Sequence, residues 1–540
     1  MMSVENVRVT ATRLAPGTGA PPGAGAMRKL RPMVTERLTR RVLLGSTAAL
    51  AIAAAAACTA PGGSASQAPQ LPQPKKKVLS IGATLEPPTM DFTTSDAASI
   101  PQVLLYNVYE TLVKLDAEGK IRPLLATRWD VSADGLVYTF NLDGGAKFAS
   151  GTPVNAQAVV ASIERMKAAS SPTIAKVHAV VDTLQAVDAG TVRVTLSRPS
   201  NSWLFQMTSK PGIVVDPALS AIDTKPMGSG PYALGAWAKG SSVTLAKNTA
   251  YWGTPGRFDE VVFKYFVEPN AMISAMLSGD LDVISNLQAP SSLAQFQDTA
   301  RYTVVEGTTT GEVTLGFNHS ASALANLKVR QAICHAIDRK KLVDTVWDGH
   351  GMLIGSMVAP TDPYYEDLSG TYPFDPAKAK QLLAEAGVGP ISLRFRVPVT
   401  KYATDSAQFI AAQLKDVGIA TTIEELDFTR WLSEVFQKGD YDMTIVAHVE
   451  TRDIGQFANP GYYWRYNNTR FQQLIAQADA APAAEFDALM KQAAKLLADD
   501  AAACWLWLMP NLLVARTGIS GIPANATSLS FDLATIASKN

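Results

Sequence analysis

The chain has 540 residues, 47% of them hydrophobic, which is enough to bury more than one sizeable core. Lys plus Arg and Asp plus Glu both count 48, so the formal net charge at pH 7 is zero. This balance excludes the strong overall field with which a protein attracts nucleic acid or an acidic surface, and we expect no nucleic-acid partner.

The N-terminal region has the layout of an export signal. Thr39-Arg40-Arg41 precedes residues 42–57, an apolar run that is shorter than the about 20 residues a membrane-spanning helix needs. Positive charge, a short apolar run and small residues before a cleavage point predict a secretory signal, and the paired arginines also allow the twin-arginine route. Residues 1–32 are then an unstructured extension or a misassigned start ahead of Met33.

Cys58 predicts a lipid anchor. Ala55-Ala56-Ala57-Cys58 resembles the lipobox of bacterial lipoproteins, in which the cysteine is acylated and becomes the new N-terminus, although Ala55 stands where Leu is usual. The alternative is a signal-anchor helix with an incidental cysteine. Residues 59–74 are rich in Pro, Gly, Ser and Gln and predict a flexible tether, so we take 58–77 as a lipid-anchored linker.

The folded body begins with a strand and a helix. Residues 78–84 (VLSIGAT) predict the strand, and residues 100–113 predict the helix. The apolar face of that helix consists of Val103, Leu104, Val108 and Leu112. Further strands are expected at 192–196 and 243–245.

Residues 125–167 predict strand, turn, strand, turn and helix. Ala133-Asp134-Gly135 and Asp143-Gly144-Gly145 form the turns, because Asp and Gly tolerate the backbone angles of a reversal. Residues 137–142 alternate as a strand between them. Asn155 caps the helix, whose apolar stripe is Val159, Ile163 and Met166.

The C-terminal half alternates helices and strands. Residues 328–347 place an apolar stripe on one helical face, and Asp375 starts a helix that Gly387 ends. Strands are expected at 391–397, 421–426 and 442–447, with helices at 407–417 and 429–438 between them. This βαβαβ order predicts parallel strands covered by helices.

Two cysteines lie in the body, Cys334 and Cys504. An exported protein can hold either a disulfide or buried free thiols. Their apolar neighbourhoods, AICHAI and AACWLWL, favour two buried thiols.

Several of these blocks resemble one family. Besides residues 125–167, the turn Met227-Gly228-Ser229-Gly230 before Pro231-Tyr232, with Asn248 before Tyr251-Trp252, resembles the extracytoplasmic solute-binding proteins of peptide-type ABC importers (substrate-binding family 5, which includes nickel receptors). The blocks at 328–347, 375–387 and 391–447 match the same family.

The resemblance implies an α/β, two-lobed periplasmic-binding-protein-like fold of type II, in the large peptide-binding class. Lobe I is expected at 78–310, with an extra subdomain at about 116–210. Lobe II is expected at 311–507, and residues 508–540 return to lobe I. The segment before the linker, 1–57, is the N-terminal extension and signal.

Ligands of open α/β sheets bind beyond the carboxyl ends of the strands. In the C-terminal unit these ends lead into loops that offer Tyr402, His448, Glu450 and Asp453. Family members that take peptides commonly carry a Trp and an Asp in the second loop, and the Asp holds the peptide ammonium. This chain has no Trp there, so Glu450 or Asp453 takes the ammonium role, or Arg452 meets a ligand carboxylate. The alternative is a solvated charged loop.

The facing lobe offers Ser95, Asp96 and Ser99, in a segment that matches the family's cleft lining. Either serine has helix capping as its alternative role. Trp464 either walls the pocket or belongs to the core.

An enzyme is not expected. The chain has no GxSxG elbow and no HExxH, and none of its 5 histidines pair at i, i+4. We expect no cofactor and no resident metal. The prediction is a monomeric, lipid-anchored receptor outside the cytoplasm that closes two hinged lobes on a small solute, peptide-like in the first instance, and delivers it to an ABC permease. The alternatives are an exported hydrolase and a receptor for a chelated metal such as nickel.

Overall fold

The computed structural model describes residues 77–219, 222 and 225–539. The predicted signal at 42–57, Cys58 and the tether at 59–74 lie outside these residues. Within the described part of the chain, no helix combines the length and the apolar character that a membrane crossing requires.

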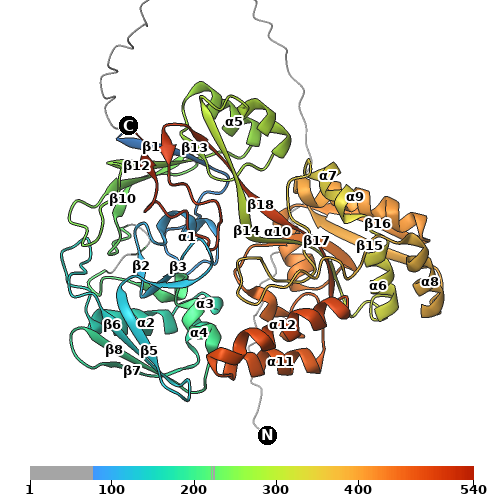
Figure 1. The fold of residues 1–540 in the computed structure, drawn as a ribbon, viewed down its shortest axis with the longest axis horizontal. Helices are drawn as coiled ribbons and strands as arrows, with labels where there is room; N and C mark the ends of the chain where they lie inside the picture. The colour runs from blue at the N-terminus through green and yellow to red at the C-terminus, as the bar shows by residue number, and fades with distance from the viewer. Residues whose placement is uncertain (1–76, 220–221, 223–224, 540) are drawn as a thin grey trace, which may run out of the picture. The chain divides into compact units, whose positions relative to one another are not determined.

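A mixed sheet runs through the body in the order β10-β11-β12-β1-β13-β18-β14-β17-β15-β16. Its strands are β1 (Val78–Ala83), β10 (Tyr232–Ala238), β11 (Ser242–Lys247), β12 (Glu260–Tyr265), β13 (Val283–Ile284), β14 (Tyr302–Phe317), β15 (Ile391–Pro398), β16 (Ile419–Leu426), β17 (Met443–His448) and β18 (Ala503–Arg516). Figure 1 shows β14 and β18 running side by side from one lobe to the other.

The two strands that connect the lobes, β14 and β18, are antiparallel, and their register shifts between Thr308 and Glu312. Before the shift, Tyr302 of β14 packs in a lobe I core. After it, Val313 and Phe317 pack in the lobe II core. The irregular pairing therefore marks the place where the sheet passes between the lobes.

The strand directions make the carboxyl ends of the two lobes face each other. In lobe II, β17 is antiparallel to β14, and β15 and β16 run parallel to β17, so all three run back toward lobe I. In lobe I, β13 is antiparallel to β18, and β1 and β12 run parallel to β13, so these run toward lobe II. The edges at which α/β proteins bind ligands thus meet between the lobes.

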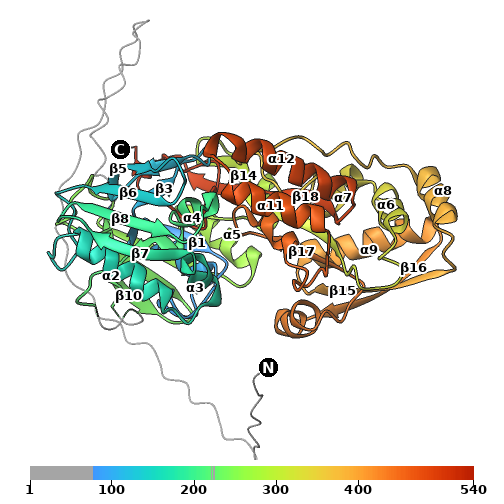
Figure 2. The same ribbon diagram turned by 90° about the horizontal axis from the view of Figure 1, so that it is seen from below.

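A separate antiparallel sheet, β5-β6-β8-β7, belongs to lobe I. Its strands are β5 (Ala126–Val131), β6 (Val137–Leu142), β7 (Val181–Ala186) and β8 (Thr191–Leu196), and α2 (Ala156–Lys167) packs on β7 and β8, as Figure 2 shows. Asn155 caps α2 by accepting the Ala158 N–H at 2.9 Å. The strand and the cap predicted here are confirmed.

The βαβαβ unit of lobe II is also confirmed, with α9 (Lys401–Asp416) between β15 and β16. Asp375 caps α8 (Pro376–Ala386) as predicted. The stripe at 328–347 belongs to two helices, α6 (Leu327–His335) and α7 (Arg339–Val346), because Asp338 caps a new helix. The helix expected at 429–438 is α10 (Phe428–Trp431) followed by a π-helix, η3 (Leu432–Gln437).

The predicted helix at 100–113 is wrong beyond its first turns. Helix α1 (Ser99–Leu104) ends early, and Tyr106 has φ +63°. The Asn107 amide donates to Phe531 O at 2.9 Å and accepts the Leu533 N–H at 3.0 Å. These bonds tie the segment to the C-terminal return of the chain, so tertiary contacts override the helical periodicity.

The glycine-rich turn of the second family block packs against the same irregular segment. A Cβ on Gly228 or Gly230 would overlap the carbonyls of Val108 and Asn107, so this close approach needs glycine.

The prediction of two buried thiols is wrong, because Cys334 and Cys504 form a disulfide with a Cα–Cα distance of 5.7 Å. Both cysteines are buried, as their neighbourhoods indicate. An apolar neighbourhood is equally typical of a half-cystine, and only the tertiary fold brings Cys334 of α6 and Cys504 of β18 together.

Replacing both cysteines with alanine (Cys334→Ala with Cys504→Ala) is expected to lower the free energy of unfolding by about 2–5 kcal/mol, because the bridge closes a long loop in the unfolded chain. Urea denaturation with and without reductant measures the change, and the double variant should not respond to reductant. Thiol titration of the denatured, unmodified full chain should find the single thiol of Cys58. Three titratable thiols would contradict the disulfide.

Candidate functional site

The end of β17 and the loop after it bring His448, Glu450 and Asp453 together, and one ligand atom of each lies within 4.8 Å of the others. His448 Nδ1 lies 3.4 Å from Asp453 Oδ2, and both side chains are buried. Glu450 is exposed. Three of the predicted residues therefore form one polar group at the carboxyl edge of the lobe II sheet.

Glu312 is a fourth residue of this group and is not among the predicted site residues. It lies on β14 opposite His448 in the strand register and is 3% exposed. Burial raises its pKa well above the usual 4.5, and the nearby Asp453, Asp362 and Glu450 raise it further. An acid next to the apolar run VTLGF was the available signal.

Two carboxyl oxygens in this group are buried without a hydrogen-bond partner among the described residues, Oε2 of Glu312 and Oδ1 of Asp453. Burial also raises the pKa of Asp453, although His448 opposes this shift. Buried acids without partners are unfavourable unless protonated or paired with a cation. The arrangement therefore suits a positively charged group that enters from between the lobes.

Arg452 lies in the same loop with φ +56°, in the left-handed region. Its Nε donates to Asp362 Oδ1 at 3.0 Å, and its guanidinium lies 3.9 Å from the ring centroid of Phe205 in lobe I. Burial raises the pKa of Asp362, and Arg452 opposes this. The Arg452 side chain is thus engaged with protein groups of both lobes.

Lobe I contributes Asp96 and Lys210. Lys210 Nζ lies 3.3 Å from Asp96 Oδ1 and donates to Ser95 O at 3.2 Å. Burial lowers the pKa of Lys210, whereas Asp96 and Glu450 oppose this shift. For Asp96, hydrogen bonds from Ser171 and Lys210 outweigh partial burial and lower the pKa. Lys210 thus stands between an acid of its own lobe and Glu450 of the other.

The remaining predicted residues make contacts inside one lobe. Ser99 Oγ donates to Glu86 O at 3.1 Å, and Ser95 Oγ accepts the Ala97 N–H, so neither serine caps α1. Tyr402 lies on α9, and its hydroxyl accepts the Ala447 N–H at 3.2 Å. Trp464 is fully buried and stacks on Phe457 with centroids 3.8 Å apart. Trp464 therefore belongs to the core.

Aromatic side chains hold the His448 ring. His448 Nε2 lies 2.9 Å from the Tyr463 hydroxyl, and the two rings are nearly parallel. Tyr463 in turn packs edge-on against Trp431 of α10, whose indole N–H donates to Thr444 Oγ1 at 2.9 Å. Trp431 of α10 thus holds Tyr463 in place, and Tyr463 holds the His448 imidazole.

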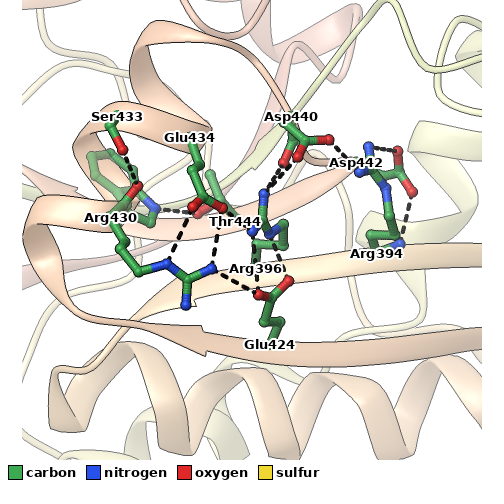
Figure 3. Close-up of polar contacts among 10 residues, drawn as sticks. Arg394, Arg396, Glu424, Arg430, Ser433, Glu434, Asp440, Asp442 and Thr444 are labelled. Carbon is green, nitrogen blue, oxygen red and sulfur yellow. Dashed lines mark hydrogen bonds and ion pairs between the residues drawn. The ribbon is translucent and has the colours of Figure 1, made fainter. Parts of the chain in front are cut away.

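An ion-pair network fixes α10 and η3 on the sheet (Figure 3). Buried Arg396 of β15 pairs with Glu424 at 2.8 Å, with Asp440 at 3.0 Å and with Glu434 of η3. Arg430 of α10 pairs with Glu434 at 3.2 Å. At Arg396, the face of β15 that points away from the core is therefore covered by these ion pairs.

Apolar side chains stay exposed at the facing edges. In lobe I these are Leu85 and Val267, just beyond β1 and β12, and in lobe II they are Val399, Phe428 and Val449, just beyond β15, β16 and β17. Backbone hydrogen bonds from Phe266 N to Ala83 O and from Val399 N to Leu426 O keep neighbouring strand ends together. The polar group therefore has an apolar rim on both lobes.

Residues 120–473 match the family model for bacterial extracellular solute-binding proteins, family 5 Middle. The glutathione-binding protein GsiB of Escherichia coli O1:K1 is 28% identical over 381 residues, which cover 68% of this chain and 72% of GsiB.

Among solved structures, the ABC transporter substrate-binding protein CtaP of Listeria monocytogenes has a TM-score of 0.76 at 21% identity, covering 86% of this chain and 100% of CtaP. DppA of Helicobacter pylori, solved with the peptide STSA, has a TM-score of 0.71 at 21% identity, covering 86% of this chain and 99% of DppA. These likenesses confirm the predicted two-lobed α/β fold.

The Glu312→Gln variant should change how stability depends on pH. Below about 4.5, the usual pKa of the group, Glu312 is protonated whether the chain is folded or unfolded. Above it, the folded protein keeps the proton that the unfolded chain releases, so the free energy of unfolding of the wild type, relative to Glu312→Gln, falls with rising pH by at most about 1.4 kcal/mol per pH unit.

Urea denaturation at steps from pH 4.5 to 8 tests this sign. Glu425→Gln, which removes one exposed carboxyl from β16, is the matched control. Wild-type and Glu312→Gln curves that stay parallel over the whole range would contradict the burial of a protonated Glu312.

Proposed function

The chain belongs to family 5 of the bacterial extracellular solute-binding proteins, as its sequence blocks indicate, and from this premise we propose that it captures a small peptide-like solute with a cationic group. The observation that carries the proposal is the buried pair Glu312 and Asp453, whose free carboxyl oxygens lie where the strand ends of both lobes meet. The family is one of binding proteins, which supports a receptor in preference to a hydrolase.

The acids recognise the cation. A charged group taken out of water needs a paired charge and hydrogen bonds, and Asp453 and Glu312 offer unused acceptors for an ammonium. Glu450 and Asp96 extend the acidic surface on the two lobes. The exposed apolar rim suits the hydrocarbon part of the same solute. The peptide bound by DppA and the glutathione bound by GsiB both carry an ammonium, which supports this class.

Capture works by closing the lobes. A solute shifts the balance between open and closed forms only if it binds the closed form more tightly, which requires contacts to both lobes at once. A group held between Asp453 and lobe I makes such contacts. The closed protein then docks on an ABC permease and releases the solute there.

A second candidate is a metal complex as the solute. One ligand atom each of His448, Glu450 and Asp453 lies within 4.8 Å of the other two, a spacing that a single cation can bridge. In this case the metal is cargo, and its chelator occupies the rest of the site.

Attachment outside the cytoplasm completes the proposal. Cys58 carries the lipid, residues 59–74 form the tether, and export uses the paired arginines or the general route. The Cys334–Cys504 disulfide supports an oxidising compartment. Lobe I spans 78–310, lobe II spans 311–507, and the protein works as a monomer.

Asp453→Asn should weaken the binding of an ammonium-bearing solute by roughly 10- to 100-fold, because it removes one charge-assisted partner. Glu450→Gln should have a smaller effect, since that carboxyl is exposed. The solute is identified by mass spectrometry after gentle purification, with glutathione and short peptides as first probes, and affinity is measured by calorimetry. Glu425→Gln is the control. Unchanged affinity in both site variants would overturn the ammonium role, and turnover of the solute would overturn the receptor.

Cys58→Ala should move the protein from the membrane fraction to the soluble exported fraction. Intact-mass measurement of the wild type should show an acylated Cys58 as the N-terminal residue. A wild-type protein that keeps residues 42–57 would contradict the lipid anchor.

A further inference from the structure

Helix α4 (Asn201–Gln206) of lobe I meets the end of α11 (Thr469–Ala480) of lobe II, and both views show the two helices side by side (Figures 1 and 2). Asp479 of α11 is at the centre. It pairs with Arg198 at 2.8 Å and accepts hydrogen bonds from the Ser202 N–H at 3.0 Å, from Ser202 Oγ at 2.7 Å and from Ser200 Oγ at 3.0 Å. We call this group of bonds the α4–α11 contact.

The two helix ends cap each other across the lobes. Ser200 is the N-cap residue of α4 but makes no capping bond within its own helix, and the Asp479 carboxylate takes that place. In return, the Asn201 amide donates to Ala478 O at 2.9 Å and to Ala481 O at 2.8 Å at the C-terminal end of α11. The first N–H groups of α4 and the last carbonyls of α11 thus have protein partners in the other lobe while the lobes touch.

The charge of Asp479 also favours contact between α4 and α11. Burial raises the pKa of Asp479, but hydrogen bonds from Arg198 and Ser202 outweigh it, so the pKa is lowered and the carboxylate stays ionised. A negative charge next to the N-terminal end of α4 is favourable because of the helix dipole. The partners are polar and Arg198 is largely exposed, so water can replace these bonds when the lobes separate.

Helix α4 has a second contact with lobe II, through Arg452. Its Phe205 lies under the guanidinium of Arg452, which comes from the segment that follows His448 and carries Glu450 and Asp453. Lobe II thus contacts α4 at two places, at its N-terminal end through Asp479 and at Phe205 through Arg452. The covalent connections between the lobes, β14 and β18, involve other residues.

We propose that the α4–α11 contact is a closure latch, which sets how readily the lobes close through residues that do not bind the solute. The latch rests on the proposed function, since it acts on the same hinged lobes. Arg452 couples the latch to the loop that carries Glu450 and Asp453, so this loop and α4 change position together.

Electron–electron distance measurements on the full chain test the latch. Spin labels are attached at Lys176→Cys on α3 (Pro172–His178) of lobe I and at Glu485→Cys on α12 (Ala483–Asp499) of lobe II, in a Cys58→Ala background. Both positions are exposed. The wild type should show a population at the short distance of the closed form.

Asp479→Asn and Asn201→Ala should each lower the ratio of the short to the long population, at least tenfold for Asp479→Asn, which loses charge-assisted bonds. Arg198→Met, at an exposed position, should shift the ratio in the same direction by less. Asp487→Asn on α12 is the matched acid-to-amide control and should leave the ratio unchanged. Circular dichroism and thermal unfolding establish that each variant is folded.

A wild type without the short population, or variants with the wild-type distribution, would overturn the latch. The proposed function is judged separately, by thermal stabilisation of the wild type with glutathione or short peptides. If the variants keep the wild-type distance distribution and the wild type is stabilised by a solute, only the latch is rejected. If the variants lose the short population but no solute stabilises the wild type, only the proposed function is rejected.

Discussion

The antiparallel pairing of β14 with β18 is the constraint on which the site depends. Because one pair of strands belongs to the sheets of both lobes, it sets the direction of every strand that is added on either side. The carboxyl ends in lobe I and lobe II must then face each other, and Glu312 on the crossing strand must lie beside His448 at the end of β17. The acidic group is therefore a consequence of topology as much as of loop sequence.

Two clusters of charge in lobe II show why burial alone does not identify a site. Arg396 is buried, but its guanidinium is matched by Glu424, Glu434 and Asp440, so the cluster in Figure 3 is satisfied within the protein. Glu312 and Asp453 are equally buried but keep carboxyl oxygens without partners among the described residues. The first cluster holds α10, whose Trp431 packs against Tyr463 beside His448. The second is incomplete by itself, which is what a binding site requires.

The sequence predicts the features that depend on residues close together in the chain. It does not predict the contacts between residues far apart in the chain. The caps Asn155 and Asp375 and the parallel unit of lobe II follow from residues a few positions apart. Asn107, just past the end of α1, bonds to Phe531, 424 positions away, and no periodicity within 100–113 carries that information. Cys334 and Cys504 are 170 positions apart, and Glu312 lies 136 positions (448 − 312) before His448, its register partner. His448, Glu450 and Asp453 were predictable because one strand end presents all three.

Affinity and selectivity have different origins in this arrangement. A shift from 1:99 to 99:1 between open and closed lobes requires about 5.5 kcal/mol of differential binding. The α4–α11 latch, as proposed, favours closure for every solute alike, so it reduces the binding free energy that any solute must supply and does not discriminate between solutes. Under the proposed function, selectivity comes from the buried acids, because a solute without a cation leaves Glu312 Oε2 and Asp453 Oδ1 without a hydrogen-bond partner. Arg452 joins the two proposed effects, since its guanidinium lies over Phe205 of α4 and it directly precedes Asp453 in the chain.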